Sequence, residues 1–423
     1  MATVILGSGI IGLSTAYYLV TTDAQPAHTI HLVDASPHLF SSASGFAAGF
    51  IARDWHRPAV AELAALSFAE HARLAEEHGG AARWGYANTR ALSYEAQAGA
   101  AARDGKRGED WLLEGTSRAL AKGSEGRRDG DLEVPRWWRR RAGDAASVVD
   151  ESGTGIVDPL NLCRFLLGEC EACGVKVHHP ATAVAITTDD GGVLSGVRIR
   201  YADSRAQPDA AIPATRVLLA AGSWTPHVFR TLFPASRTAI PVTSLAGHSL
   251  VVRTPPGTHH ADATHAMFCA VPAFSPEIFS RPSGVIYVAG LNSSTLPLPE
   301  PAGPASPVAA DLQTLRTVAA QLIDSGDAPL EILREALCFR PVTAKGTPLL
   351  GRIADAHLGA GVRTRGAALG GVFLAVGHGP WGISLSLGTG KVMAELMHNR
   401  ALSADISALG LDAYRRQDVT AKL

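Results

Sequence analysis

Three glycines near the amino terminus have the spacing of a phosphate-binding turn. Gly7, Gly9 and Gly12 form a G-x-G-x-x-G pattern between an apolar segment with strand character and an apolar helix. Such glycines permit a tight turn, close approach of a pyrophosphate and close packing of the helix, whose free N–H groups favour anions. Asp34 ends the next expected strand, where a carboxylate can accept hydrogen bonds from a ribose diol. This order of elements predicts a dinucleotide site, and the acid disfavours a 2′-phosphate.

Five segments together resemble the D-amino acid oxidase superfamily, which includes glycine oxidase, sarcosine oxidase and the fructosyl-amine oxidases. They are residues 4–19, 41–49, 216–224, 338–351 and 377–383. The resemblance implies that the chain binds FAD and oxidises a C–N bond of a small amine or amino acid. It does not identify the substrate, because large central stretches match nothing that can be placed residue by residue.

The resemblance also implies which residues contact the FAD. In the family, the loop at 41–49 wraps the flavin and its pyrophosphate, and 216–224 forms a second cofactor strand and turn. The expected contacts are Gly7, Gly9, Ile10, Ile11, Gly12, Asp34, Ala35, Ser41, Ser42, Ser44, Gly45, Ala48, Gly49, Val184, Ala221, Gly222, Trp224, Cys338, Gly377, Gly379, Trp381, Gly382 and Ile383.

The last glycine-rich turn has a physical interpretation of its own. Gly377, Gly379 and Gly382 would let main chain approach an aromatic ring system closely, just before an expected helix. A reduced flavin is anionic near N1 and O2, and the backbone around Trp381–Ile383 would stabilise that charge, as donors do at a developing oxyanion. A glycine-rich helix cap without a ligand is the alternative.

Arg340, His248 and Trp381 are the candidate catalytic residues. In the family pattern the arginine at the position of Arg340 pairs with the carboxylate of amino acid substrates, and a planar guanidinium can do so bidentately. An arginine paired with an acid of the protein is the alternative. His248 and His378 are pocket-lining candidates, because hydride transfer from an amine needs no obligatory protein base.

Cys338 has two interpretations. In the sarcosine and fructosyl-amine oxidase branch a cysteine near this position is joined to the flavin, whereas in the glycine oxidase branch the matching site is small and the flavin is not covalently held. The chain departs from the sarcosine-type pattern at Ala344-Lys345, where Pro-Asp is usual. A buried inert thiol is the alternative to covalent attachment.

Cys163, Cys170 and Cys173 lie at a spacing that can also suggest metal or redox chemistry. They fall on one expected apolar helix, between Asp158 and Gly174, and no partner pair stands at zinc spacing. We therefore expect them to pack in the core, and we predict no metal site.

Length and composition bound the remaining possibilities. The 423 residues are enough for two domains, and a net charge of -1 with 18% charged residues excludes a strong attraction to nucleic acid or acidic membranes. No apolar run approaches the roughly 20 residues of a membrane-spanning helix. The amino terminus lacks the features of a signal peptide, and the five cysteines are expected to be reduced and intracellular.

The expected fold class is α/β, with a Rossmann-type FAD-binding domain and an interleaved α+β substrate domain built on an antiparallel sheet. Residues 95–145, in which charges crowd around Trp111, Trp137 and Trp138, are expected to form a surface insertion or lid. The predicted bounds are 1–54, 148–232 and 336–412 for the FAD-binding domain, 55–147 and 233–335 for the substrate domain, and 413–423 for an unpacked tail.

The function expected from these residues is hydride transfer from a small amine or amino acid to flavin N5, with O2 as the acceptor and H2O2 as a product. A dehydrogenase with another electron acceptor and a flavin-bearing trafficking or scaffold protein are the alternatives. Ala421-Lys422-Leu423 is a close variant of the tripeptide that peroxisomal import receptors bind. We therefore expect a peroxisomal location, and a cytoplasmic one if that tripeptide is not recognised.

Overall fold

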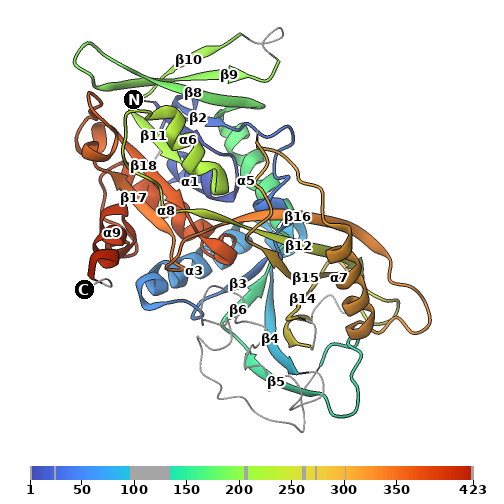
Figure 1. Ribbon diagram of the computed structural model, residues 1–423. Coiled ribbons are helices and arrows are strands. Elements are labelled where there is room, and N and C mark those ends of the chain that lie inside the picture. Colours follow the sequence, from blue (N-terminus) through green and yellow to red (C-terminus); the bar gives the residue numbers. More distant parts are fainter. Residues whose placement is uncertain are drawn as a thin grey trace.

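The computed structural model of the protein describes residues 2–22, 25–95, 134–203, 208–259, 263–271, 274–300 and 302–420. Two large sheets and one small sheet organise these residues, with helices packed on the larger ones (Figure 1). The chain therefore has the predicted α/β class, with a Rossmann-type sheet and a second, mainly antiparallel sheet. Trp111 and the tripeptide Ala421-Lys422-Leu423 lie outside the described residues, and so does most of the predicted lid.

The first large sheet is the Rossmann-type sheet, with the strand order β17-β18-β11-β1-β2-β7. Its strands are β1 (Thr3–Leu6), β2 (Ile30–Val33), β7 (Lys176–His178), β11 (Arg216–Leu219), β17 (Leu349–Ile353) and β18 (Gly371–Val376). All pair in parallel except β17, which runs antiparallel to β18. β1, β11 and β18 are buried along their whole length, as expected for parallel strands covered on both faces.

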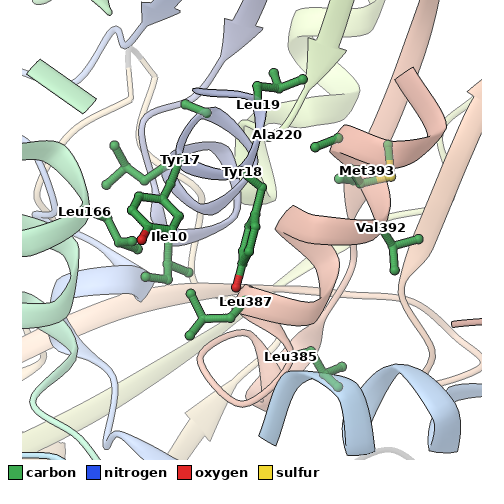
Figure 2. Packing of buried hydrophobic residues seen from close by; sticks show 14 of the residues in the cluster. Ile10, Tyr17, Tyr18, Leu19, Leu166, Ala220, Leu385, Leu387, Val392 and Met393 are labelled. Atoms are coloured by element: carbon green, nitrogen blue, oxygen red, sulfur yellow. The ribbon is translucent and has the colours of Figure 1, made fainter. Parts of the chain in front are cut away.

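Three helices form the core against one face of this sheet. They are α1 (Ile10–Thr21), α5 (Pro159–Cys173) and α8 (Ser386–Met397). Figure 2 shows α1 between its two neighbours, with Tyr17 directed towards Leu166 of α5 and Tyr18 towards Leu387 of α8. Elements from both ends of the chain therefore share one core.

The predicted ends of α5 are confirmed. Asp158 precedes the helix and its side chain accepts a hydrogen bond from the N–H of Asn161 at 3.0 Å, while Gly174 ends the helix in the left-handed region at a φ of 97°. Cys163 and Cys170 are buried in the core as expected, but Cys173 is exposed. Among the described residues there is no cluster of potential metal ligands.

A small antiparallel sheet covers one end of the Rossmann-type sheet, at the top of Figure 1. It consists of β8 (Ala181–Thr188), β9 (Leu194–Tyr201) and β10 (Ala210–Pro213). Val197 and Ile199 of β9 pack with Val33 and Leu6 of the Rossmann-type sheet. The small sheet therefore extends the core beyond the end of β2.

The second large sheet has the order β16-β12-β15-β14-β13-β4-β6-β3, with β5 paired to β4. Its strands are β3 (Phe50–Ala52), β4 (Ala87–Glu95), β5 (Ala145–Asp150), β6 (Thr154–Ile156), β12 (Thr243–Arg253), β13 (Thr264–Ala270), β14 (Glu277–Arg281), β15 (Val285–Ser293) and β16 (Ile332–Val342). Apart from the parallel pair β13 and β4, neighbouring strands are antiparallel. Helix α7 (Ala309–Leu322) packs on β12 and β15 (Figure 1).

The remaining α-helices connect these layers or lie at their edges. They are α2 (Ala43–Phe46), α3 (Ala61–His78), α4 (Gly80–Trp84), α6 (Thr225–Leu232) and α9 (Leu411–Thr420). Among the described residues, no helix is long and apolar enough to cross a membrane.

The predicted domain bounds differ from the packing at several points. β3 and β6 belong to the second large sheet although their residues were assigned to the FAD-binding domain, and β16 crosses the predicted boundary between residues 335 and 336. Helix α3, assigned to the substrate domain, contributes Leu63 and Leu74 to the core around α1. The chain therefore passes between the two large sheets more often than the sequence patterns indicated.

Two further expectations are wrong in their local detail. Trp137 and Trp138, expected on a surface insertion, are buried at 3% and 5% exposure in a cluster with α7. The stretch after Tyr414, expected as an unpacked tail, continues helix α9, in which the buried Tyr414 packs with the core near β17.

The contact between α1 and α8 yields a test. An added Cβ at Gly390 would lie 2.5 Å from the backbone carbon of Ser14, so the two helices could not keep their spacing. We expect Gly390→Ala to lower the free energy of unfolding by about 1–3 kcal/mol, as overpacking does. Urea denaturation measures the change.

Gly168 is the matched control, because it lies in helix α5 and an added Cβ there would meet nothing within 4 Å. Gly168→Ala is expected to raise the free energy of unfolding by about 0.5–1 kcal/mol, the ordinary gain in helix propensity. Stabilisation by both substitutions would show that α1 and α8 are not closely packed.

Candidate functional site

One cavity runs from the glycine-rich turn of the Rossmann-type sheet to the second large sheet. It holds about 1660 Å³ of empty space, counting the part that opens to solvent. The predicted residues that line it are Gly7, Gly9, Ile10, Ile11, Asp34, Ala35, Ser41, Ser42, Ser44, Ala48, Gly49, Ala221, Gly222, Trp224, Cys338, Arg340, Gly379, Gly382 and Ile383.

Asp34 organises the nucleotide end of this cavity. One carboxylate oxygen, Oδ2, accepts the N–H of Ser8 at 2.8 Å, and the other accepts the N–H of Ser36 at 3.0 Å. Gly7 turns the chain at a φ of 107°, in the region that favours glycine, and its N–H donates to Val33 at 2.8 Å. The Asp34 carboxylate therefore holds the turn through Ser8, and Asp34 also lines the cavity.

The loop that contains α2 forms the facing wall. Ser44 Oγ accepts the N–H of Ile10 at 3.0 Å, which holds the loop against the amino terminus of α1. An added Cβ at Gly9 would stand 3.0 Å from the same Ser44 oxygen. The space between turn and loop is therefore tight at Gly9, and a side chain there would require Ser44 to shift.

These observations agree with a dinucleotide such as FAD. The glycine turn presents a helix amino terminus to the cavity, an acid lies where a ribose is expected, and the cavity is long enough to continue to the second sheet. Thr182 and Ala183 of β8 line it beside Asp34, while Val184, which was predicted, does not. The residues present fit the cofactor that the sequence analysis expected.

The second sheet presents one face to the other end of the cavity. Side chains alternate along a strand, so Cys338 and Arg340 of β16 point to the same side as each other. Arg340 donates through Nη1 to Asn292 Oδ1, and its guanidinium group lies across Gly247, where an added Cβ would collide with it. Gly247 was missed in the sequence because its role appears only in the pairing of β12 with β16.

Burial keeps the thiol of Cys338 protonated. The side chain is 4% exposed, and this burial raises its pKa, although the nearby guanidinium groups of Arg340 and Arg334 act in the opposite direction. Tyr287 lines the cavity beside it, and burial raises the pKa of its phenol as well. Neither group is therefore ionised at neutral pH.

His248 does not line the cavity, which corrects its assignment as a candidate catalytic residue. Its ring is 1% exposed and faces helix α7, where Nε2 accepts the N–H of Val308 at 3.0 Å and Nδ1 lies 3.5 Å from the Asp311 carboxylate. Burial lowers the pKa of His248, partly offset by Asp311. The strand alternation explains the error, because His248 is one residue beyond Gly247 and so projects from the opposite face.

Trp381 also lies outside the cavity lining. Its backbone N–H donates to the His378 carbonyl at 3.0 Å, and its ring packs against His56 with centroids 4.4 Å apart. The N–H of Trp381, one of the backbone donors expected for a reduced flavin, is thus engaged within its own turn. Gly379, Gly382 and Ile383 of the same segment do line the cavity.

Three predicted glycines serve packing instead of lining the cavity. An added Cβ would collide with the Gly7 carbonyl at Gly12, with the Phe40 carbonyl at Gly45, and with Thr343 Cγ2 at Gly377. Each lets another part of the chain pack closely against a cofactor-binding segment, on the side away from the cavity lining. Their spacing in the sequence could not distinguish this supporting role from direct contact.

The turn at Ile383 is fixed by residues that the sequence did not indicate. His71 of α3 donates from Nε2 to the Ile383 carbonyl at 2.9 Å. Burial lowers the pKa of His71 to about 4, so the ring makes this contact in its neutral form. Ser384 Oγ accepts the N–H of Ala52 at 3.0 Å. His378 lines the cavity itself, and burial lowers its pKa to about 3.

Further lining residues have no motif of their own. They are Leu6, Val33, Ser36, Phe40, Ala43, Ala47, Phe50, Ala181, Thr182, Ala183, Ala220, Ser223, Val228, Glu277, Tyr287, Ala302, Gly303, Phe339, Pro341, Ala375, Val376 and Pro380. Many of them are neighbours of predicted residues on the same strand or loop, and only that proximity in the sequence could have indicated that they line the cavity. Glu277 and Tyr287 lie on β14 and β15, for which the sequence offered no such indication. His378, which was expected to line the pocket, does so.

Arg281 joins the second sheet to the cofactor loop. The side chain is 4% exposed, and its Nη1 donates to Asp158 at 2.8 Å while Nη2 donates to the carbonyls of Ala47 and Ala48 at 3.0 and 2.9 Å. Arg334 adds a contact from Nη1 to the Gly45 carbonyl at 3.3 Å. The guanidinium groups therefore hold the loop that faces the glycine-rich turn.

This arrangement predicts the effect of Arg281→Met. The change leaves Asp158 without its buried partner and removes the donors that order the loop, so the apoprotein should lose about 3 kcal/mol of unfolding free energy. The dissociation constant for FAD should rise roughly tenfold, because binding must then also order the loop. Denaturation of the apoprotein and a fluorescence titration with FAD measure the two effects.

Arg253→Met is the control, since Arg253 forms an exposed pair with Glu331 at 2.6 Å on the same sheet. It should change neither quantity appreciably. An unchanged FAD dissociation constant in the Arg281 variant would mean that the contacts stabilise the fold without positioning the cofactor loop.

Comparisons with known proteins agree with this geometry. A fission yeast protein (Schizosaccharomyces pombe) named as an oxidoreductase is 26% identical over 437 residues, which cover 96% of each chain. Glycine oxidase from Geobacillus kaustophilus superposes with a TM-score of 0.70 at 19% identity and 97% coverage of both chains. L-proline dehydrogenase from P. horikoshii superposes with a TM-score of 0.72 at 15% identity and 98% coverage of both.

The solved structures share the fold, and the family follows from the sequence itself. The sequence profile of the FAD dependent oxidoreductase family (DAO) matches residues 2–396, which include every strand of both large sheets. The chain therefore belongs to the DAO family of FAD dependent oxidoreductases.

Proposed function

We propose that the protein is an FAD-dependent oxidase that acts on the C–N bond of a small amine carrying a carboxylate. The observation that carries the proposal is the single cavity that joins the nucleotide end at Gly7 and Asp34 to the sheet face at Arg340. A cofactor held at one end and a substrate held at the other would meet within one cavity.

FAD, when bound, supplies the hydride acceptor at N5 and passes the electrons on to O2, which yields H2O2. Loss of a hydride from the carbon that bears an uncharged amine leaves an imine, which water hydrolyses. Arg340 supports this step by binding: its guanidinium can pair with the substrate carboxylate and fix the orientation of the adjacent carbon. Asn292 and the absence of a side chain at Gly247 hold the guanidinium in place.

The lining of the cavity favours a reaction that excludes bulk water. Tyr287 contributes aromatic surface near Arg340, and a lower local dielectric strengthens an ion pair between a guanidinium and a carboxylate. The histidine that lines the cavity, His378, is kept neutral by burial, which lowers its pKa to about 3. Within the described lining, the chain therefore presents no histidine cation to compete for the carboxylate.

A dehydrogenase with another electron acceptor is the second candidate. The comparison structures include both a glycine oxidase and an L-proline dehydrogenase on this fold, so the fold does not decide between the two acceptors. Consumption of O2 with formation of H2O2 distinguishes the two candidates.

The decisive experiment measures oxygen consumption and peroxide. The purified protein should be yellow with one FAD per chain, and a screen of amino acids and secondary amines should find substrates that consume O2 and form H2O2 in equal amounts. Arg340→Ala should lower kcat/KM by about 10²–10³-fold for carboxylated substrates, because a desolvated ion pair contributes a few kcal/mol. Decarboxylated analogues should be affected much less.

Arg200→Ala serves as the control, because Arg200 is 61% exposed, pairs with Asp209 on the small sheet and does not itself line the cavity. Turnover with an artificial acceptor but not with O2 would favour the dehydrogenase. Equal losses on acids and on decarboxylated analogues would exclude the role of Arg340, and a colourless protein that does not take up FAD would exclude the proposal as a whole.

Cys338 gives a separate prediction about the attachment of the cofactor. Because burial raises the pKa of the thiol, the nucleophilic thiolate is disfavoured, and we expect FAD to be bound without a covalent link. Precipitation with acid should therefore release all of the flavin into the supernatant. Flavin that stays on the wild-type chain but is released from Cys338→Ser would show a bond to this sulfur.

A further inference from the structure

His71 is a buried histidine of α3 that contacts the turn at Ile383. Its ring is 1% exposed, and its Nε2 donates to the Ile383 carbonyl at 2.9 Å. Among the described residues the other ring nitrogen, Nδ1, has no hydrogen-bond partner although it is buried. A buried polar atom without a partner costs free energy of folding, so the stability of the fold alone does not account for a histidine at this position.

The Ile383 carbonyl does not need His71 in order to be satisfied. It also accepts the hydroxyl of Ser386 at 2.8 Å and the N–H of Ser386 at 3.2 Å. A carbonyl oxygen has two lone pairs, and two donors are already enough to occupy them. The third donor therefore restricts the direction of the carbonyl instead of supplying a missing hydrogen bond.

The same turn contributes two backbone donors to the wall of the cavity. Gly382 and Ile383 both line the cavity, and among the described residues the N–H of neither one donates a hydrogen bond. Backbone N–H groups are rarely left unpaired in a folded chain, so these two are the donors that the turn offers to a ligand. A reduced flavin is anionic near N1 and O2, and donors aimed at that charge stabilise the reduced form.

Helix α3 also holds α8 at a second point (Figure 1). Ser67, one helical turn before His71, is fully buried, and its Oγ accepts the N–H of Gly388 at 3.0 Å. Residues four apart lie on one face of a helix, so Ser67 and His71 act from the same side of α3. The Ser67 contact reaches α8 itself, whereas the His71 contact reaches the turn that carries the two donors. The roles of the two contacts can therefore be separated by substitution.

We propose that His71 is a positioning residue that raises the reduction potential of the bound FAD. By restricting the Ile383 carbonyl, the imidazole holds the N–H groups of Gly382 and Ile383 where negative charge forms on the reduced flavin, so no reorganisation is needed at that moment. Because burial lowers the pKa of His71 to about 4, the ring is a neutral donor and adds no charge of its own at neutral pH. The inference rests on the FAD of the proposed function, but on neither its substrate nor O2.

Two substitutions of similar volume isolate the donor. His71→Gln keeps an N–H near the position of Nε2, and His71→Met removes it. Reduction of the holoprotein in equilibrium with redox dyes measures the midpoint potential. In His71→Met the affinity for reduced FAD relative to oxidised FAD should fall about tenfold, which lowers the potential of a two-electron couple by about 30 mV. His71→Gln should keep the wild-type potential.

Sulfite binding provides a spectroscopic check on the same holoproteins. Sulfite adds to flavin N5 and leaves negative charge on the N1 side of the ring, so the adduct needs the same backbone donors as the reduced flavin. Bleaching of the flavin absorbance should therefore require more sulfite in His71→Met than in His71→Gln. His71→Leu, which also lacks a donor, takes the place of His71→Met if the latter does not fold.

Ser67→Ala is the control for a purely structural role. It removes a buried contact between α3 and α8, so the urea midpoint of the apoprotein should fall while the potential stays unchanged. His71→Met should show the opposite pattern, because it also removes the unpartnered Nδ1. Equal potentials in the His71→Gln and His71→Met variants, or a shift in Ser67→Ala as large as that in His71→Met, would overturn the inference.

These measurements do not depend on turnover. A protein that oxidises no amine but shows the difference between the His71→Gln and His71→Met variants would refute only the oxidase function. An active oxidase whose potential is the same in the wild type and in both variants would refute only the role of His71. A wild type that takes up no FAD would overturn both.

Discussion

The contacts of the buried Arg281 guanidinium with Asp158 and the cofactor loop are the interaction on which the rest of the site depends. The cavity is formed by two layers: the Rossmann-type sheet lines its nucleotide end, and the second sheet lines its other end. Arg281 leaves the second sheet, pairs with Asp158 at the start of α5 and binds two carbonyls of the cofactor loop. Because an isolated buried charge is costly, these partners are required, and they set the distance between the two halves.

Glycines play the complementary role of allowing close approach. Gly12 lets α1 pack against the turn at Gly7, and Gly390 lets α8 pack against α1, so cofactor segments from opposite ends of the chain reach one place. The neutral histidines His71 and His378 fill positions behind or beside the cavity without adding charge. The positive field near Cys338 therefore comes from Arg334 and Arg340.

The sequence predicted what depends on local pattern. The turn at Gly7, the acid at Asp34, the cap of α5 and the arginine at 340 were accessible because each has a short motif or a fixed spacing. His248 and Trp381 were misplaced because a side chain's direction depends on strand register and on hydrogen bonds within a turn. Glu277, Tyr287 and Gly247 were inaccessible, since only the pairing of β12, β14, β15 and β16 brings them together.

The order of elements along the chain also has a consequence for synthesis. The cofactor turn follows β1 at the extreme amino terminus, but the strand β18 and helix α8 that complete its core lie at Gly371–Val376 and Ser386–Met397. A ribosome needs on the order of tens of seconds to add the intervening residues. During that interval the apolar faces of β1 and α1 lack their final partners, so the nascent chain depends on protection from aggregation, and cofactor loading waits until α8 has been synthesised.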